Sequence, residues 1–228
     1  VHLLYDDHLQ IPDRTLLDGE IEKEIESFLN AIKLTEEDII KIKENVEKNI
    51  GLSYGDIFDA HLMILKDKVL IDKTISEIRK TRKNAGQVFY RIMKRTENSL
   101  ISLQDEYLKE RAADIKDVKR RVIRKLQGDS RICIHDVSEP AVVVSPELTP
   151  SITVNLDKSK ILGFVTERGG RTSHVAILAR ALEVPSVVGI ANLMKNVEPG
   201  DIIIIDGGIG NIIINPEESE IRKYEGLK

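Results

Sequence analysis

Apolar positions in the first half of the chain recur at helical spacing. From about residue 18 to residue 126 they fall three and four positions apart, and this stretch contains no proline. Such a pattern predicts helices that each bury one face. Helices with wide apolar faces pack on one another, so we expect a bundle of four or more. The expected helices cover about 18–50, 57–65 with a continuation past Asp67, 85–100 and 107–126.

Two details concern the ends of these helices. Thr35 is followed by Glu36, Glu37 and Asp38, which is typical of an N-cap with an acidic first turn. The long first helix is therefore expected to bend or restart at Thr35. Gly128 follows the last apolar stripe and is expected to end the last helix.

After Gly128 the pattern changes to short apolar runs, which predict strands. The last two runs flank Gly207, Gly208 and Gly210 and predict a hairpin. Strands this apolar are covered by helices or buried on both faces. Residues 1–13 are also strand-like, so an α/β domain is expected to close across the helical insert. The expected strands are RICIHD (131–136), AVVVS (141–145), KILGFVTE (160–167), PSVVG (185–189), IIIID (202–206) and NIIIN (211–215).

Composition narrows the class of protein. The net charge of −4 argues against nucleic acid as the main partner. The single Cys133 excludes an internal disulfide and suits a reducing cytoplasm. No apolar run approaches the ~20 residues that span a bilayer, and the start VHLLYDDHLQIPD has no signal-peptide pattern. Since the chain lacks an initiator Met and residues 216–228 resemble the beginning of a helix, we expect it to be part of a longer protein.

The candidate chemistry lies in residues 168–189, RGGRTSHVAILARALEVPSVVG. A glycine turn that leads into a helix start is an anion site, because the first backbone N–H groups have no partners within the helix. Gly169 and Gly170 let the backbone approach an anion, and Arg171 supplies a guanidinium. Thr172 or Ser173 is expected at the N-cap.

His174 would lie in the first turn of this helix, where the helix dipole disfavours an imidazolium. A neutral imidazole keeps a lone pair and can attack phosphorus. The sequence therefore favours a histidine that carries a phosphoryl group, with Thr172 and Ser173 in its phosphate-binding turn. Two other interpretations remain open: a structural histidine in a tight turn, and a metal ligand, although no second His or Cys lies at ligand spacing from His174.

The segment GGRTSHVAILARALEVPSVVG resembles the phosphohistidine signature of phosphoenolpyruvate-utilising enzymes. AHLMILKD, DEYLKERAADIKDVKRRV and ELTPSIT resemble the amino-terminal half of enzyme I of the bacterial sugar phosphotransferase system. The resemblance implies an α/β phosphohistidine (swivelling) domain with an inserted all-α helical bundle. It implies that residues 1–17 and 129–215 form the α/β part, that 18–128 bind the carrier protein HPr, and that 216–228 begin a linker.

The resemblance also implies residue roles. His174 would take phosphate from phosphoenolpyruvate and pass it to a histidine of HPr, and the Thr153 hydroxyl would steady the unphosphorylated imidazole. From the residues alone, Thr153 would be an ordinary strand-end hydroxyl and His61 a packed core histidine, whereas Met63 and Ile64 could equally be core residues. The implied HPr-binding residues are Asp59, His61, Met63, Ile64, Leu70 and Arg111.

The sequence departs from the family in two ways. Leu52, Ser53, Lys66, Lys68 and Val69 dilute the acidic character of the docking helix, so electrostatic steering of a basic partner is expected to be weaker. The carboxyl-terminal barrel, which in the family holds phosphoenolpyruvate, Mg²⁺ and the dimer contacts, is missing. The fragment is therefore expected to need no cofactor, to be monomeric and to exchange phosphate only with phospho-HPr, whereas the full-length enzyme is expected to be a homodimer.

Three alternatives remain. The swivelling domain of a pyruvate phosphate dikinase or phosphoenolpyruvate synthase shares the histidine signature, but the sequence shows no glycine-rich nucleotide loop. A paralogue of the nitrogen-regulatory branch would have the same chemistry with another carrier. A non-enzymatic helical interaction module would contain only a structural histidine.

Overall fold

The computed structural model describes residues 1–4, 11–49, 51, 54–103, 105–128, 139–148, 158–170 and 173–226. The chain forms two compact units. Unit 1 comprises Val1–Asp7 and Cys133–Lys228, and unit 2 comprises His8–Ile132. The helical part is thus inserted between two pieces of the other unit, as the change of pattern along the sequence predicted.

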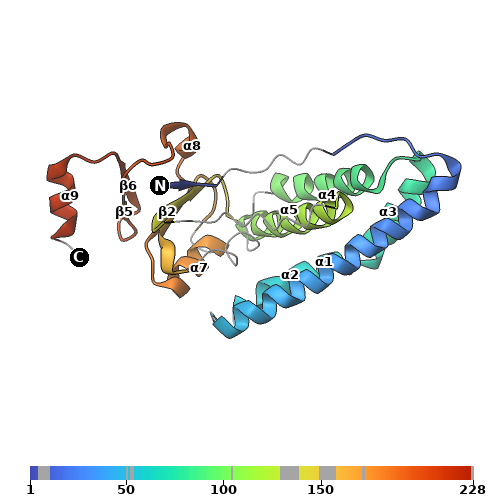
Figure 1. Ribbon diagram of the computed structural model, residues 1–228, viewed down its shortest axis with the longest axis horizontal. Helices are drawn as coiled ribbons and strands as arrows, with labels where there is room; N and C mark the ends of the chain where they lie inside the picture. Colours follow the sequence, from blue (N-terminus) through green and yellow to red (C-terminus); the bar gives the residue numbers. More distant parts are fainter. Residues whose placement is uncertain are drawn as a thin grey trace. The chain divides into compact units, whose positions relative to one another are not determined.

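The helical unit contains five α-helices among its described residues (Figure 1). Helices α4 and α5 pack along one another, and α5 also packs against α1 and α2. This confirms the predicted bundle. The elements are η1 (Asp18–Glu20), α1 (Ile21–Asn49), α2 (Asp56–Leu65), α3 (Lys68–Thr81), α4 (Ala85–Ser102) and α5 (Glu106–Leu126).

Aromatic rings and aliphatic side chains fill the centre of the bundle. Phe28 and Phe89 are fully buried, with ring centroids 5.5 Å apart. The amino end of α4 is capped from another helix, because the Glu24 carboxylate of α1 accepts a hydrogen bond from the Ala85 amide at 2.8 Å. This contact satisfies one of the amide groups that a helix start leaves unpaired.

A buried ion pair joins α4 to α5. Glu97 and Lys119 are each only 5% exposed, and the Lys119 ammonium donates a hydrogen bond to Glu97 Oε2. Lys94 donates to the other carboxylate oxygen at 3.0 Å, and the Lys119 ammonium lies 5.1 Å from the centre of the Tyr90 ring. Burial alone would raise the pKa of Glu97, but the hydrogen bonds from Lys119 and Lys94 outweigh it and lower that pKa.

Helix α1 runs without interruption through Thr35, so a restart of the helix there is wrong. Thr35 is fully buried, and its hydroxyl donates to the Ala31 carbonyl at 2.7 Å. A threonine hydroxyl that bonds the carbonyl one turn back does not need to cap a new helix. At the other end of the bundle, Gly128 adopts a φ of 68° directly after the Gln127 C-cap of α5, as predicted.

Unit 1 contains a four-stranded parallel sheet in the order β1-β2-β3-β4. Helix α7 connects β3 to β4, and a β5–β6 hairpin follows. The pairing of His2 with Val143 closes the unit across the helical insert, as expected. The predicted strand at 131–136 lies outside the described residues. The elements are β1 (His2–Leu3), β2 (Ala141–Ser145), η3 (Lys158–Lys160), β3 (Ile161–Thr166), α7 (His174–Leu182), β4 (Ser186–Val188), α8 (Leu193–Asn196), β5 (Ile203–Asp206), β6 (Asn211–Ile214) and α9 (Glu218–Glu225).

The hairpin packs on the sheet. Val144 and Val165 of the sheet form a buried cluster with Leu193, and isoleucines of β5 and β6 cover it. A side-chain carbon at Gly163 would lie 2.8 Å from the Pro185 carbonyl oxygen as well as 2.8 Å from Ile205 Cδ1, and the fixed backbone oxygen makes glycine necessary at this point of β3.

The boundaries of the units differ from those expected. Residues 11–17, which were expected with the α/β part, belong to the helical unit. The Leu16 amide donates to the Arg82 carbonyl at 2.7 Å, and the Asn84 amide donates to the Arg14 carbonyl at 3.1 Å. These backbone bonds tie the segment to the α3–α4 connection. At the other end, α9 belongs to unit 1, with Ile221 and Tyr224 facing the same cavity as β5.

Candidate functional site

The turn between β3 and α7 contains the glycines predicted to bind phosphate. Gly169 has a φ of 118°, a conformation that side chains other than glycine rarely adopt. A side-chain carbon there would lie 3.1 Å from Ser173 Oγ. At Gly170 nothing lies within 4 Å of the position that such a carbon would occupy. The turn therefore brings bare backbone close to the start of α7.

Ser173 occupies the N-cap position of α7, as one of the two predicted residues. Its φ and ψ of −61° and 154° are extended, and its carbonyl accepts a hydrogen bond from the Ile177 amide at 3.1 Å. Its hydroxyl, however, caps no amide of the first turn, and within the described part of the chain this buried oxygen makes no hydrogen bond. No N-cap side chain therefore competes with an anion for the first-turn amides.

The site lies at the carboxyl ends of the parallel strands. The Glu167 amide after β3 donates to the Ser145 carbonyl at the end of β2 at 3.2 Å, and the Arg168 amide donates to the Pro146 carbonyl at 3.0 Å. These bonds join the connections that follow β2 and β3. Ligands of open α/β sheets bind at this edge, where such connections meet the start of a helix.

The structure describes only some of the residues predicted to form the catalytic site. His174 is the first residue of α7, and only its backbone is described. Thr153, Arg171 and Thr172 lie outside the described residues. Gly169, Gly170 and Ser173 are brought together by the turn, with the Ser173 amide donating to the Gly170 carbonyl at 3.0 Å.

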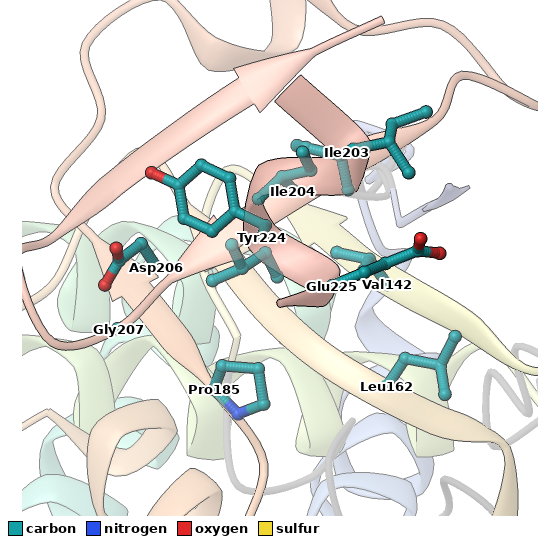
Figure 2. A pocket seen from close by; sticks show the side chains of 11 residues that line it. Val142, Leu162, Pro185, Ile203, Ile204, Asp206, Gly207, Tyr224 and Glu225 are labelled. Atoms are coloured by element: carbon teal, nitrogen blue, oxygen red, sulfur yellow. The ribbon is translucent and has the colours of Figure 1, made fainter. Parts of the chain in front are cut away.

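A cavity of about 550 Å³ lies near the amino ends of the parallel strands, away from the turn that leads into α7. Its lining includes Val142 and Leu162, which stand near the starts of β2 and β3, and Pro185, which precedes β4. Figure 2 shows Tyr224 and Glu225 of α9 on one side and Pro185 and Leu162 on the other. None of these residues belongs to the predicted site, so the turn between β3 and α7 and this cavity are separate features of unit 1.

The predicted HPr-binding residues of the helical unit differ widely in exposure. Met63 is 76% exposed, the highest value among the exposed large apolar side chains in the described part of the chain. Ile64 and Leu70 are half-buried. The side chain of Arg111 is 40% exposed, and that of Asp59 is 50% exposed and pairs with Lys43.

His61 does not lie at the surface. Its side chain is fully buried, with Nε2 3.2 Å from Asp114 Oδ1, Nδ1 3.6 Å from Asp117 Oδ2 and its ring edge-on to Phe58. The expectation that His61 contacts a partner directly is therefore wrong in this structure. A buried polar ring needs polar partners: Nε2 has Asp114 of α5, whereas Nδ1 makes no hydrogen bond within the described part of the chain.

Three comparisons with known proteins address the family. The model described as "PEP-utilising enzyme, N-terminal" matches residues 1–111, and that described as "PEP-utilising enzyme, mobile domain" matches residues 137–210. The solution structure of Enzyme I (nEIt) is 39% identical to this chain with a TM-score of 0.72, and covers 97% of this chain and 90% of that one. The chain belongs to the enzyme I family.

Curated relatives show how much of an enzyme I this chain represents. The phosphoenolpyruvate-protein phosphotransferase of Staphylococcus epidermidis is 40% identical over 226 residues, which are 99% of this chain and 38% of that protein. The one from Listeria monocytogenes is 40% identical over 209 residues, 92% and 36% of the two chains. The chain thus corresponds to the amino-terminal part of an enzyme I. The N-terminal domain of Enzyme 1 - Nitrogen, at 22% identity and a TM-score of 0.58, shares the fold.

Three residues of this enzyme I chain have an exposure or a contact that the sequence analysis did not predict. Val69 is 75% exposed, although it was treated only as a residue that dilutes acidic charge. Asp114 and Asp117 lie in the quoted motif AADIKDV but received no role. Their spacing of three residues places them on one helix face, which is the signal that could have drawn attention to them.

Two further properties concern the described residues of this enzyme I chain. No group of three or more His, Cys, Asp or Glu side chains among them is arranged to hold a metal ion. None of the described helices combines the length and the apolar character that crossing a membrane would require.

Proposed function

We propose that this chain is the phosphoryl-carrying and carrier-docking part of a phosphoenolpyruvate–protein phosphotransferase. His174 accepts a phosphoryl group and passes it to a histidine of HPr in the cytoplasm. The observation that carries the proposal is the helix start itself: His174 is the first residue of α7, after a glycine turn and an N-cap whose hydroxyl leaves the first-turn amides uncapped.

The proposed step transfers a phosphoryl group between two imidazoles. The lone pair of the neutral His174 ring forms a new N–P bond while the N–P bond of phospho-HPr breaks. The electron pair of the broken bond returns to the carrier's ring. His174 releases its remaining ring proton to solvent and the carrier's ring takes one up, so charge and protons balance. The same step in reverse loads the carrier.

The other predicted residues assist this step in the proposal. The backbone of Gly169 and Gly170, the first-turn amides and the hydroxyls of Thr172 and Ser173 meet the phosphoryl oxygens, and the Arg171 guanidinium neutralises their charge. The Thr153 hydroxyl fixes the ring of the unphosphorylated His174. Phosphoenolpyruvate and Mg²⁺ bind to the carboxyl-terminal part of the longer enzyme, which also dimerises, while this fragment is monomeric.

The surface that receives HPr is assigned to the end of α2 and the start of α3. We call Met63, Ile64, Val69 and Leu70, with Asp59 and Arg111, the docking surface. Its support is the exposure of two large apolar side chains, Met63 at 76% and Val69 at 75%. Apolar side chains of this kind can serve as the anchors that dominate the binding energy of a protein interface.

Met63→Ala is expected to weaken HPr binding about tenfold, because apolar anchors of an interface typically contribute more than 1 kcal/mol each. Calorimetric titration measures the affinity. The control is Lys80→Ala, an exposed change at the end of α3 outside the docking surface, which should change the affinity less than about twofold. The reverse order of the two effects would place the interface elsewhere.

Arg171→Ala is expected to slow transfer about 100-fold, because it removes one charged donor from the transferring group. Single-turnover transfer from phospho-HPr gives the rate, and circular dichroism checks that the fold is intact. An unchanged rate in the folded variant would make Arg171 a structural residue.

The experiment that tests the whole proposal mixes the protein with phospho-HPr and follows the intact mass. We expect the mass to rise by one phosphoryl group, in an acid-labile form typical of phosphohistidine. No mass increase in the wild-type chain would exclude the phosphocarrier function and favour a non-enzymatic interaction module.

A further inference from the structure

One buried carboxylate contacts side chains of two of the helices that contribute to the docking surface, α2 and α5. Asp114 lies on α5 and is 2% exposed. Its Oδ1 lies 3.2 Å from His61 Nε2 on α2, and its Oδ2 accepts a hydrogen bond from an Arg111 guanidinium nitrogen at 3.1 Å. His61 is two residues from Met63 on the same short helix, and Arg111 is itself a predicted contact residue.

Asp114 is buried, but through these hydrogen bonds it is connected to Arg111, a predicted contact residue, and to α2, which carries Met63. A carboxylate with two charged or polar partners fixes the direction of both, because each hydrogen bond depends on its geometry. Asp114 therefore orients the Arg111 guanidinium. Through the His61 ring it also sets the rotation of α2, and with it the direction in which Met63 is presented.

Asp117 provides an internal comparison. It lies one turn further along α5, is 1% exposed and faces the same imidazole, with Oδ2 3.6 Å from His61 Nδ1. Its arginine contact is Arg121, 3.4 Å from Oδ2, whose side chain is only 14% exposed against 40% for Arg111. Both aspartates thus face His61, while Asp114 bonds Arg111 of the docking surface and Asp117 bonds Arg121, which lies outside it.

We propose that Asp114 is a positioning residue for carrier docking. It never touches HPr, but it pre-organises Arg111 and α2 so that binding does not have to order them. This inference rests on the proposed docking of HPr. It assigns to the buried α2–α5 contact a role in recognition, beyond its contribution to packing.

The test compares Asp114→Asn with Asp117→Asn. For Asp114→Asn we expect HPr to bind about tenfold more weakly in calorimetric titration, the energy of one interface anchor. The KM for phospho-HPr should rise by the same factor while the transfer rate at saturating carrier stays within about twofold, since the lost interaction acts on binding alone. Asp117→Asn should change carrier binding much less.

A double-mutant cycle separates positioning from general destabilisation. With Arg111 already replaced by alanine, Asp114→Asn should weaken HPr binding by much less than tenfold, because its main target is gone. Asp117→Asn and Arg111→Ala should instead act independently. If Asp114→Asn does not fold, Asp114→Glu keeps the charge but displaces the guanidinium, and the same cycle applies to it.

Equal effects of Asp114→Asn and Asp117→Asn on HPr affinity, or full additivity of Asp114 and Arg111 substitutions, would overturn the inference. The titrations use unphosphorylated HPr, so they do not depend on transfer. A wild-type chain that binds HPr without accepting phosphate contradicts the proposed transfer but still tests the docking. A wild-type chain that does not bind HPr contradicts both.

Discussion

Replacing His174 by alanine is expected to abolish phosphoryl uptake from phospho-HPr, from about one group per chain to none. The reason is chemical: the imidazole is the proposed acceptor, and removing a catalytic nucleophile typically costs a factor of about 10⁴ or more. Intact mass after incubation with phospho-HPr measures the loss. Because His174 is the first residue of α7 and alanine is a good helix former, the fold should be preserved.

The matched control is His2→Ala. This histidine lies in β1, and its backbone pairs with Val143, so the substitution leaves the strand in place. We expect normal uptake by this variant. Equal uptake by His174→Ala and the wild type would mean that another residue carries the phosphoryl group, and the anion site at the start of α7 would then be structural.

Replacing Glu97 by glutamine is expected to lower the free energy of unfolding by about 3–5 kcal/mol, the typical cost of removing one partner of a buried ion pair. Glu97 and Lys119 are both 5% exposed, so the Lys119 charge would remain in the bundle without its carboxylate. Urea unfolding followed by circular dichroism measures the change, which suits a chain without Trp.

The control for Glu97→Gln is Glu22→Gln. Glu22 pairs with Arg79 at the surface, with side chains 74% and 56% exposed, and exposed ion pairs contribute only about 0–1 kcal/mol. A loss at Glu97 as small as the loss at Glu22 would mean that Lys119 is solvated in the folded bundle.

The contribution of the Glu97 carboxylate to the free energy of unfolding depends on pH. The pKa of this carboxylate in the folded chain lies below the ordinary value of 4.5, despite burial, because of the lysine hydrogen bonds. Between the folded and unfolded pKa values the unfolded chain binds more protons, so stability falls as the pH falls. The stabilisation is complete above this window and lost below it. In Glu97→Gln this part of the acid dependence should disappear.

The helices and strands were predictable where one periodicity ran over a whole element. The apolar stripes predicted a bundle of four or more helices, of which the structure describes five, and the isoleucine runs around Gly207 predicted the hairpin. Thr35 misled the prediction because a local N-cap pattern, Thr followed by acidic residues, also occurs inside a helix when the hydroxyl bonds the preceding turn. Sequence alone did not show which of these two hydrogen bonds forms.

Contacts between residues far apart in the sequence were not predictable. His61 meets Asp114 across 53 positions, and nothing in either local pattern says that they face each other. The resemblance placed His61 in a docking motif, and the apolar stripe placed it in the core. The structure supports the core position. The segment 11–17 was assigned to the wrong unit for the same reason, since its pairing with 82–84 is a tertiary contact.

The parallel pairing of β1 with β2 has a consequence for synthesis on the ribosome. β1 is made first, yet its partner Val143 follows His2 only after the entire helical unit has been translated. Domains generally fold as units in the order in which they emerge. The bundle can therefore fold while the first strand is still unpaired, and the turn that leads into α7 is translated only afterwards. The proposed docking surface would then exist on the nascent chain before the proposed phosphohistidine.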